Sequence, residues 1–289
     1  MHIFLTGGTG FIGRHLLEVL AKTEHRVTAL CRQDKLAQIS NARLTWVSKP
    51  MDQLAAADFA DVDVLIHLAS PGVPPQQADW TTLFYWNVSV LLQLMGTART
   101  AGVRRCVLAG SSVEYGRSAD FFDFIPHDAP LLPTYGYAAS KAAGYACASA
   151  FATENKMELC YLRIFSAFGE GQYRGNFWPS LHEAALKGDD FSITPGEQIR
   201  DYVPVGRVAQ AFRATAERSD VVAGIPWVRN LGSGQPISIR QFAAHWWSNW
   251  NARGRLQPGM LPYRSGEIMR CVPQIDPTVW EGPQYKPEK

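Results

Sequence analysis

The chain has 289 residues, of which 46% are hydrophobic and 19% charged, as in a globular protein that buries a sizeable core. This composition excludes disorder as the dominant state. The formal net charge of +2, without a cluster of lysines and arginines, argues against nucleic acid as a partner. No apolar run approaches the ~20 residues that span a bilayer, so no membrane partner is expected either.

Segments typical of strands and helices alternate through the first 169 residues. Short apolar or β-branched runs predict strands, and these lie at residues 2–6, 26–31, 62–70, 104–112 and 157–169. Apolar residues at helical spacing predict helices, and these lie at residues 11–22, 82–102 and 135–155. The alternation indicates an α/β fold, a Rossmann-type doubly wound parallel sheet with right-handed crossovers.

The chain changes character after about residue 168. Helical stretches at residues 178–188 and 239–250 are separated by turn-rich segments that hold much of the proline. We therefore expect residues 1–168 to form the Rossmann core, with a returning element near residues 200–232. Residues 169–289 are expected to form a smaller, mostly C-terminal lobe.

The five cysteines are widely spaced and include no C-x-x-C pair: Cys31, Cys106, Cys147, Cys160 and Cys271. Neither a disulfide framework nor a metal site is indicated. We expect small buried side chains in a reducing compartment. Because the first residues enter a structured motif at once, a cytoplasmic protein is expected.

A glycine loop follows the first strand. Gly7, Gly10 and Gly13 stand between a strand and a helix of a strand–helix–strand unit. Glycines there allow a tight turn, close approach of a pyrophosphate and packing of the helix against the strand. N–H groups at the helix start can then bind the phosphates. The loop predicts a dinucleotide cofactor.

The residues after the second strand indicate which cofactor is bound. An acidic residue there would accept hydrogen bonds from a ribose 2′-hydroxyl, but the chain continues from Cys31 to Arg32. A guanidinium suits a phosphate, so NADP(H) is favoured and NAD(H) stays possible. The alternative is that Arg32 is merely solvated and that Asp34 contacts the ribose.

Three residues form a candidate catalytic set. Tyr137 and Lys141 are four residues apart at the head of a helix, so both project from one face. A neighbouring ammonium would lower the pKa of a tyrosine, which makes the phenol a better acid–base group. Ser111, at the end of the fourth strand, could hydrogen-bond a carbonyl oxygen where negative charge develops.

These motifs together resemble the extended branch of the short-chain dehydrogenase/reductase family, the NAD-dependent epimerase/dehydratase type that modifies nucleotide sugars. The resemblance rests on G-x-x-G-x-x-G after Thr6, "SSVEYG", "YAASK", "IRDYVPVGRVAQAF" and "PYRSGEIMR", and it covers nearly the whole chain. It implies a homodimer, a second lobe that binds the substrate, and an Asn87 that helps order the active site. The cofactor-binding residues it implies are Gly7, Gly10, Phe11, Ile12, Gly13, Arg32, Leu68, Ala69, Asn87, Tyr137 and Lys141. His67 is interpreted as a core residue.

The resemblance also implies a nucleotide-sugar substrate. Arg200 and Arg264 match arginines that hold the diphosphate, and Glu267 matches a ribose ligand. Ser112 and Ser166 are further candidates for substrate contact, although Ser166 stands where the family often has asparagine. Another departure is Gly206-Arg207, where the family usually has an acidic residue.

The residues at the end of the fourth predicted strand indicate the type of reaction. Dehydratases of the family carry Thr-Asp-Glu where this chain has Ser111, Ser112 and Val113, so the acid–base pair for eliminating water is missing. We expect an NADPH-dependent reductase of a nucleotide-linked 4-keto-6-deoxy sugar, with Tyr137 as the proton donor. The alternatives are an NAD-dependent 4-epimerase and a catalytically silent NADP-binding protein of the same fold.

Overall fold

The computed structural model describes residues 1–31, 42–71 and 78–280, and its main body is a parallel sheet. Seven strands lie in the order β10-β6-β5-β4-β1-β2-β3, and all of their pairings are parallel. Their bounds are β1 His2–Thr6, β2 Arg26–Cys31, β3 Leu44–Ser48, β4 Val64–His67, β5 Arg105–Ser111, β6 Glu158–Ile164 and β10 Trp227–Leu231. The strand order reverses between β1 and β4, which is where doubly wound sheets bind ligands. The predicted Rossmann-type fold is confirmed.

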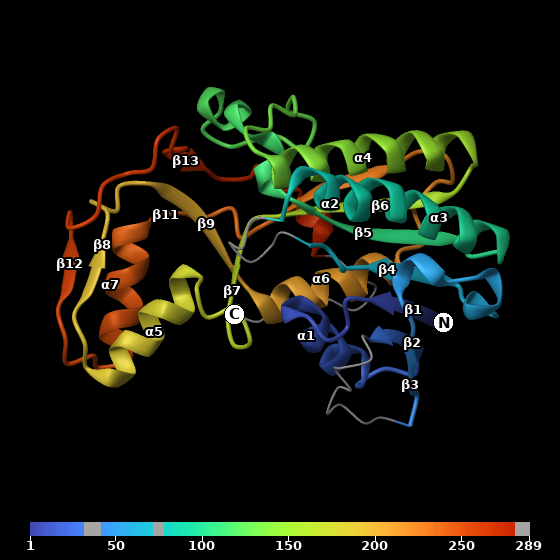
Figure 1. Cartoon of the computed structure of the whole chain (residues 1–289), viewed down its shortest axis with the longest axis horizontal. Helices are drawn as coiled ribbons and strands as arrows, with labels where there is room; N and C mark the ends of the chain where they lie inside the picture. The colour runs from blue at the N-terminus through green and yellow to red at the C-terminus, as the bar shows by residue number, and fades with distance from the viewer. Residues whose placement is uncertain (32–41, 72–77, 281–289) are drawn as a thin grey trace.

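Helices cover both faces of this sheet (Figure 1). On one face lie α1 Phe11–Leu20 and α6 Val205–Glu217, and on the other lie α2 Trp80–Phe84, α3 Leu91–Thr100 and α4 Gly136–Glu154. Alternation along each strand supplies the two cores. Ile3 and Leu5 pack in the core that includes α1 and α6, whereas Phe4 packs in the core that includes α3 and α4.

The rest of the chain builds smaller sheets beside the first (Figure 1). One joins β7 Ser166–Phe168, β9 Ile199–Pro204, β11 Pro236–Ser238 and β13 Arg270–Cys271, and the other pairs β8 Phe191–Ile193 with β12 Leu256–Pro258. Helices α5 Phe177–Lys187 and α7 Ile239–Asn249 pack on each other through a core that includes Leu181, Ala243 and Trp247. In the sequence, α6 and β10 lie between α5 and α7, and they return the chain to the large sheet, where β10 pairs with β6.

Several elements differ from the sequence prediction. The expected helix 82–102 is divided, because the π-helical segment η3 Tyr85–Val90 separates α2 from α3. The expected strand 157–169 is divided at Phe165 into β6 and β7, which belong to different sheets. The edge strand β3 was not predicted. Short 3₁₀ turns complete the structure: η1 Met51–Gln53, η2 Ala56–Phe59, η4 Ser112–Tyr115, η5 Arg117–Phe121 and η6 Pro277–Val279. Among the described helices, none is both long and apolar enough to cross a bilayer.

Candidate active site

The glycine loop connects β1 to α1 at the carboxyl edge of the sheet. The N–H of Gly10 donates to the carbonyl oxygen of Gly7 at 2.9 Å, which closes the turn. A Cβ on Gly13 would lie 2.1 Å from that same carbonyl oxygen, so only glycine fits there. The loop also lies against the end of β4, since the N–H of Ala69 reaches Thr6 Oγ1 at 3.4 Å.

The start of α1 is suited to an anion. Its N-cap is Gly10, which has no side chain to bond the first turn, and that turn holds no acidic residue. The N–H groups of Phe11, Ile12 and Gly13 lack intrahelical acceptors by helix geometry. Together with the helix dipole, they can bind the diphosphate of a dinucleotide.

His67 ends β4 beside this loop. Its Nδ1 lies 2.7 Å from Thr6 Oγ1, and burial lowers the pKa of His67 to about 3, so the ring is neutral. The structure therefore supports its interpretation as a satisfied core residue. Leu68 and Ala69 follow directly, at the edge of the sheet where the glycine loop lies.

Ser111, Tyr137 and Lys141 come together at the end of β5. Ser111 is the last residue of β5, while Tyr137 and Lys141 occupy the first turns of α4. The hydroxyls of Ser111 and Ser70 lie close enough to the phenol of Tyr137 to lower its pKa. Lys141 Nζ donates to the carbonyl oxygen of Ala109 at 2.6 Å, which ties α4 to β5. The predicted catalytic set is thus one cluster.

The electrostatics of Tyr137 differ from the sequence-based expectation. Burial, and then the charge of Glu114, raise the pKa of Tyr137 well above the usual 10.0, while the hydrogen bonds from Ser70 and Ser111 lower it in part. The prediction that Lys141 depresses this pKa is not met, because burial dominates and the ammonium is bonded to Ala109. Burial also lowers the pKa of Lys141, against a rise caused by Glu114.

Asn87 lies in the π-helical segment η3 and orders the residues around Tyr137. Its amide nitrogen donates to Ser140 Oγ at 2.9 Å, and its Oδ1 accepts from Ser70 Oγ at 2.8 Å. Ser140 Oγ in turn donates to the backbone carbonyl of Tyr137 at 2.9 Å. The helix distortion therefore directs a buried amide into the site, as π-bulges at functional sites often do.

A buried carboxylate lies directly behind this cluster. Glu114 accepts from the N–H of Ser111 at 2.7 Å, from the hydroxyl of Tyr161 at 2.8 Å and from Arg163 Nε at 2.7 Å. The side chains of Glu114 and Arg163 are 0% and 2% exposed. Glu114 was not predicted to belong to the site. Its position three residues after Ser111, in the segment "SSVEYG", is the signal in the sequence that could have indicated it.

Two of the predicted substrate ligands, Arg200 and Ser166, lie in strands of the smaller sheet, and Arg264 and Glu267 precede its strand β13. Arg200, in β9, forms an ion pair with Glu267, with Arg200 Nη2 2.8 Å from Glu267 Oε1. Ser166 begins β7 and pairs in register with Tyr202, two residues after Arg200. Arg264 is exposed, and its charge acts on Tyr135, next to α4.

Cys271 lies near the predicted substrate ligands. It is half-buried in β13, where it pairs in register with Arg200, and Ser112 is close enough to its thiol to lower the pKa in part. Burial raises the pKa of Cys271 to about 11, so the thiol is neutral. Cys271 therefore lies between Ser112, directly after β5, and Arg200 of β9. The sequence around this cysteine did not indicate that position.

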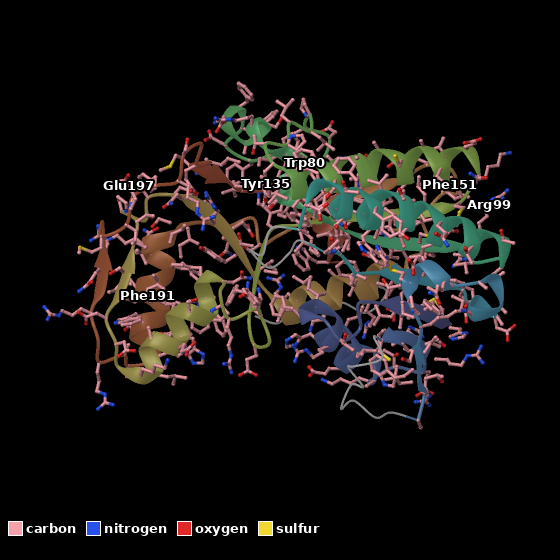
Figure 2. The ribbon with its side chains drawn as sticks, in the orientation of Figure 1. Trp80, Arg99, Tyr135, Phe151, Phe191 and Glu197 are labelled. Carbon is pink, nitrogen blue, oxygen red and sulfur yellow. The ribbon has the colours of Figure 1, made fainter. Side chains whose placement is uncertain are left out.

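Aromatic side chains stand at the start of α4. Trp80 and Tyr135 are 59% and 50% exposed, and Trp80 approaches Gly136 closely (Figure 2). They mark the rim of the site on the side of α2. Arg32 and its alternative Asp34 lie outside the described residues.

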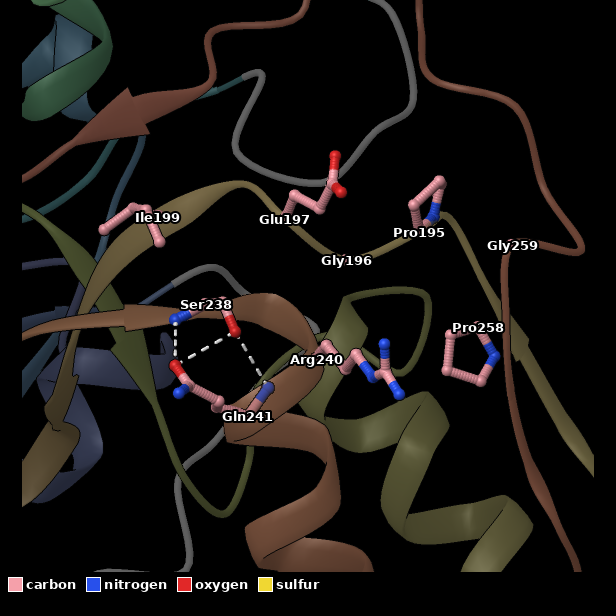
Figure 3. A pocket seen from close by; sticks show the side chains of 9 residues that line it. All are labelled: Pro195, Gly196, Glu197, Ile199, Ser238, Arg240, Gln241, Pro258 and Gly259. Atoms are coloured by element: carbon pink, nitrogen blue, oxygen red, sulfur yellow. Dashed lines mark hydrogen bonds between the residues drawn. The ribbon is translucent and has the colours of Figure 1, made fainter.

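A separate hollow of about 560 Å³ opens on the smaller lobe (Figure 3). It lies between the 195–197 turn, the start of α7 and β12. Ile199 lines it, and since neighbouring side chains of a strand point to opposite faces, Arg200 faces away from it. The hollow is therefore distinct from the site at Ser111. Within the described ranges, no three His, Cys, Asp or Glu side chains gather as a metal site.

Comparison with known proteins identifies the family. The sequence model of the NAD dependent epimerase/dehydratase family matches residues 3–228. The chain belongs to this family.

Relatives and solved structures of the epimerase/dehydratase family agree with this assignment. UDP-glucuronic acid decarboxylase 1 of Xenopus tropicalis is 28% identical over 83% of this chain, which spans 58% of that protein's length. UDP-glucose 4-epimerase of Corynebacterium glutamicum is 27% identical over 83% of this chain and 78% of its own. A solved structure of MoeE5 in complex with UDP-glucuronic acid and NAD has a TM-score of 0.84 at 26% identity, covering 97% of this chain and 92% of that one.

Family membership confirms the predicted resemblance and the expectation of an enzyme. One departure from the family pattern also receives a structural explanation. Arg207, next to Gly206 at the start of α6, places its guanidinium 4.4 Å from the ring centre of Trp280. The cation there packs on a C-terminal aromatic ring, where the family usually has an acidic residue.

Proposed function

We propose that the chain reduces a nucleotide-linked 4-keto-6-deoxy sugar with NADPH. The proposal rests on the cluster of Ser111, Tyr137 and Lys141 at the end of β5 and on Arg32, which favours NADP(H). Burial and the charge of Glu114 raise the pKa of Tyr137, which suits a group that acts as a proton donor. A reductase needs this group only as a proton donor, whereas an epimerase must also use it as a base in its first step.

Elimination of water has no support in this site. The positions beside Ser111 are Ser112 and Val113, and neither can act as a carboxylic acid or base. The buried carboxylate of Glu114 is held by three donors, from Ser111, Tyr161 and Arg163. Dehydratase chemistry is therefore not proposed.

In the proposed mechanism, Ser111 donates a hydrogen bond to the substrate carbonyl oxygen and stabilises the negative charge that develops there. A reduced nicotinamide supplies the hydride when it is bound. Tyr137 gives its proton to that oxygen. Lys141 and Asn87 keep α4 and the serines in place through their bonds to Ala109, Ser140 and Ser70.

The cofactor site fits a dinucleotide at the start of α1, and the preference for NADP(H) over NAD(H) rests on Arg32. The residues that would hold the cofactor are Gly7, Gly10, Phe11, Ile12, Gly13, Leu68, Ala69, Asn87, Tyr137 and Lys141. NAD is named in the solved MoeE5 complex, so binding of both cofactors should be compared directly.

Residues 169–289 are proposed to bind the nucleotide sugar, with Arg200 and Arg264 at the diphosphate and Glu267 at a ribose. Arg200 is already oriented by Glu267, which gives its guanidinium a defined position. Ser112 and Ser166 would contact the substrate from β5 and β7. Homodimerisation and a cytoplasmic location stay predictions.

A 4-epimerase that holds NAD tightly is the second candidate. It is favoured by the similarity to the UDP-glucose 4-epimerase of Corynebacterium glutamicum. The same Ser111, Tyr137 and Lys141 would serve, with Tyr137 acting first as base and then as acid.

The test is to mix the protein with NADPH and a panel of nucleotide-linked 4-keto-6-deoxy sugars and nucleotide hexoses. Absorbance of the reduced nicotinamide is followed together with chromatography of the sugars. Stoichiometric loss of NADPH with a keto sugar supports the reductase. Interconversion of hexoses without net loss of cofactor would replace it with the epimerase, and absence of any Tyr137-dependent turnover would refute both.

A further inference from the structure

We propose that Glu114 is a positioning residue of this site, and that its buried carboxylate fixes Ser111 and places a negative charge behind Tyr137. This inference rests on the proposed function only for its kinetic test. The carboxylate is buried and accepts three hydrogen bonds, one of them from the N–H of Ser111, and its charge acts on Tyr137 and Lys141.

Hydrogen bonds around Ser111 fix its backbone at the end of β5. Glu114 Oε1 accepts the N–H of Ser111 at 2.7 Å, while Ser111 Oγ accepts the N–H of Val113 at 3.4 Å. These two bonds close the 3₁₀ turn η4 directly after β5. The backbone of Ser111 is thereby fixed at the point where its hydroxyl meets Tyr137.

The buried carboxylate of Glu114 has a complete set of partners. Its two oxygens receive three donors, and Arg163 compensates its charge. The guanidinium of Arg163 also donates to the carbonyl oxygen of His127 at 2.8 Å and lies 4.3 Å from the ring centre of Tyr145. A buried pair of this kind is stable only when its remaining hydrogen bonds are satisfied, and here they are.

Gly110 of β5 leaves space for the carboxylate of Glu114. A Cβ on Gly110 would lie 2.2 Å from the Tyr161 ring and 3.0 Å from Glu114 Oε1. Glycine at this position allows the carboxylate and its tyrosine partner to approach the end of β5. The chain thus brings a negative charge to the reacting edge of the sheet without exposing it to substrate.

Groups from several elements act on Tyr137. They are Glu114 of η4, Tyr135 directly before α4, Ser70 after β4 and Ser111 of β5, while Tyr161 of β6 interacts with Tyr137 in turn. Glu114 is the anion among them that raises the pKa of Tyr137, and it also raises that of Lys141. His67, behind Lys141, is neutral. Removing the charge of Glu114 should therefore ease loss of the phenolic proton.

The variant Glu114→Gln tests this, because glutamine keeps an acceptor oxygen for the N–H of Ser111 and removes the charge, while its amide nitrogen replaces the oxygen that accepts from Arg163. In the reductive direction, turnover falls as Tyr137 deprotonates at high pH. We expect the falling limb of the kcat/KM profile to move to lower pH by about one unit or more. A profile that coincides with the wild type would overturn the inference.

The matched control is Glu158→Gln. Glu158 forms the equivalent buried pair with Arg105 on the same two strands, β5 and β6, at their opposite ends. Loss of a buried pair there should lower stability and leave the pH profile unchanged. If both variants move the limb equally, the effect is general loosening and the inference fails.

Two further measurements keep the test decisive. Should Glu114→Gln not fold, the double variant Glu114→Gln/Arg163→Met removes both charges and is expected to shift the limb in the same direction. NMR titration of ¹³Cζ-labelled tyrosine, assigned with Tyr137→Phe, needs no substrate. A midpoint lowered in Glu114→Gln supports the inference even if the proposed reductase fails, and an unchanged midpoint refutes it even if the reductase stands.

Discussion

The ammonium of Lys141 lies 2.6 Å from the carbonyl oxygen of Ala109 and donates a hydrogen bond to it. This bond joins the first turns of α4 to β5 two residues before Ser111, so one contact positions the helix that carries Tyr137. Lys141→Met removes both the bond and a buried cation of the site. We expect kcat to fall about 100-fold. Steady-state kinetics checks this, and wild-type turnover in a folded variant would contradict it.

The glycine loop gives a prediction about stability and cofactor binding. In Gly13→Ala, the new methyl group would meet the carbonyl oxygen of Gly7, which must move and distort the loop. We expect a loss of about 1–3 kcal/mol in the free energy of unfolding and much weaker binding of NADPH. Denaturant unfolding and a fluorescence titration of NADPH measure the two effects.

Gly206→Ala is the matched control for that variant. Gly206 lies in the first turn of α6, and a Cβ there meets no atom within 4 Å. Alanine should therefore leave binding of NADPH unchanged and raise stability by about 0.5–1 kcal/mol. Equal losses in both variants would refute the account of the loop.

The substrate side is tested with Arg264→Ala. The side chain is exposed, so its loss should leave the fold intact while removing a charged donor to the proposed diphosphate. We expect the KM for the nucleotide sugar to rise about tenfold or more, with unchanged affinity for NADPH. Isothermal titration with each ligand separates the two affinities, and an unaltered sugar affinity would remove Arg264 from the site.

Arg32 decides the proposed cofactor preference. Arg32→Ala removes the guanidinium expected to bind the 2′-phosphate of NADPH, which NADH lacks. The KM for NADPH should rise far more than the KM for NADH. Parallel kinetics with both cofactors measures this, and equal effects would show that Arg32 does not select between them.

Much of the large sheet could be predicted because β1, β2, β4 and β5 are short apolar runs and α1 has apolar residues at a period of 3.6, each flanked by glycines or turns. The edge strand β3 escaped prediction because Leu44–Ser48 is short and only half-buried, so its sequence carries no clear alternation. The break in the helix over 82–102 also lacks a local signal. It arises where Asn87 bonds Ser70 and Ser140, 17 and 53 residues away.

Within the candidate site, residues in local motifs could be predicted, whereas residues that meet through long-range contacts could not. Ser111, Tyr137 and Lys141 were predictable because motif spacing and order place them at one sheet edge. Glu114 and Arg163 are 49 residues apart, and nothing in either segment indicates that they pair. The role of Cys271 likewise depends on β13 pairing with β9, a long-range contact that the sequence pattern does not encode.

The most direct test of the central claim uses NADPH that carries deuterium at the transferable position of the nicotinamide. With a nucleotide-linked 4-keto-6-deoxy sugar, the account predicts one deuterium at C4 of the product for each NADPH oxidised, and no transfer in Tyr137→Phe. Mass spectrometry and NMR of the sugar measure both. Isomerised nucleotide hexoses, with the deuterium still in the cofactor and no net oxidation, would contradict the reductase and identify an epimerase.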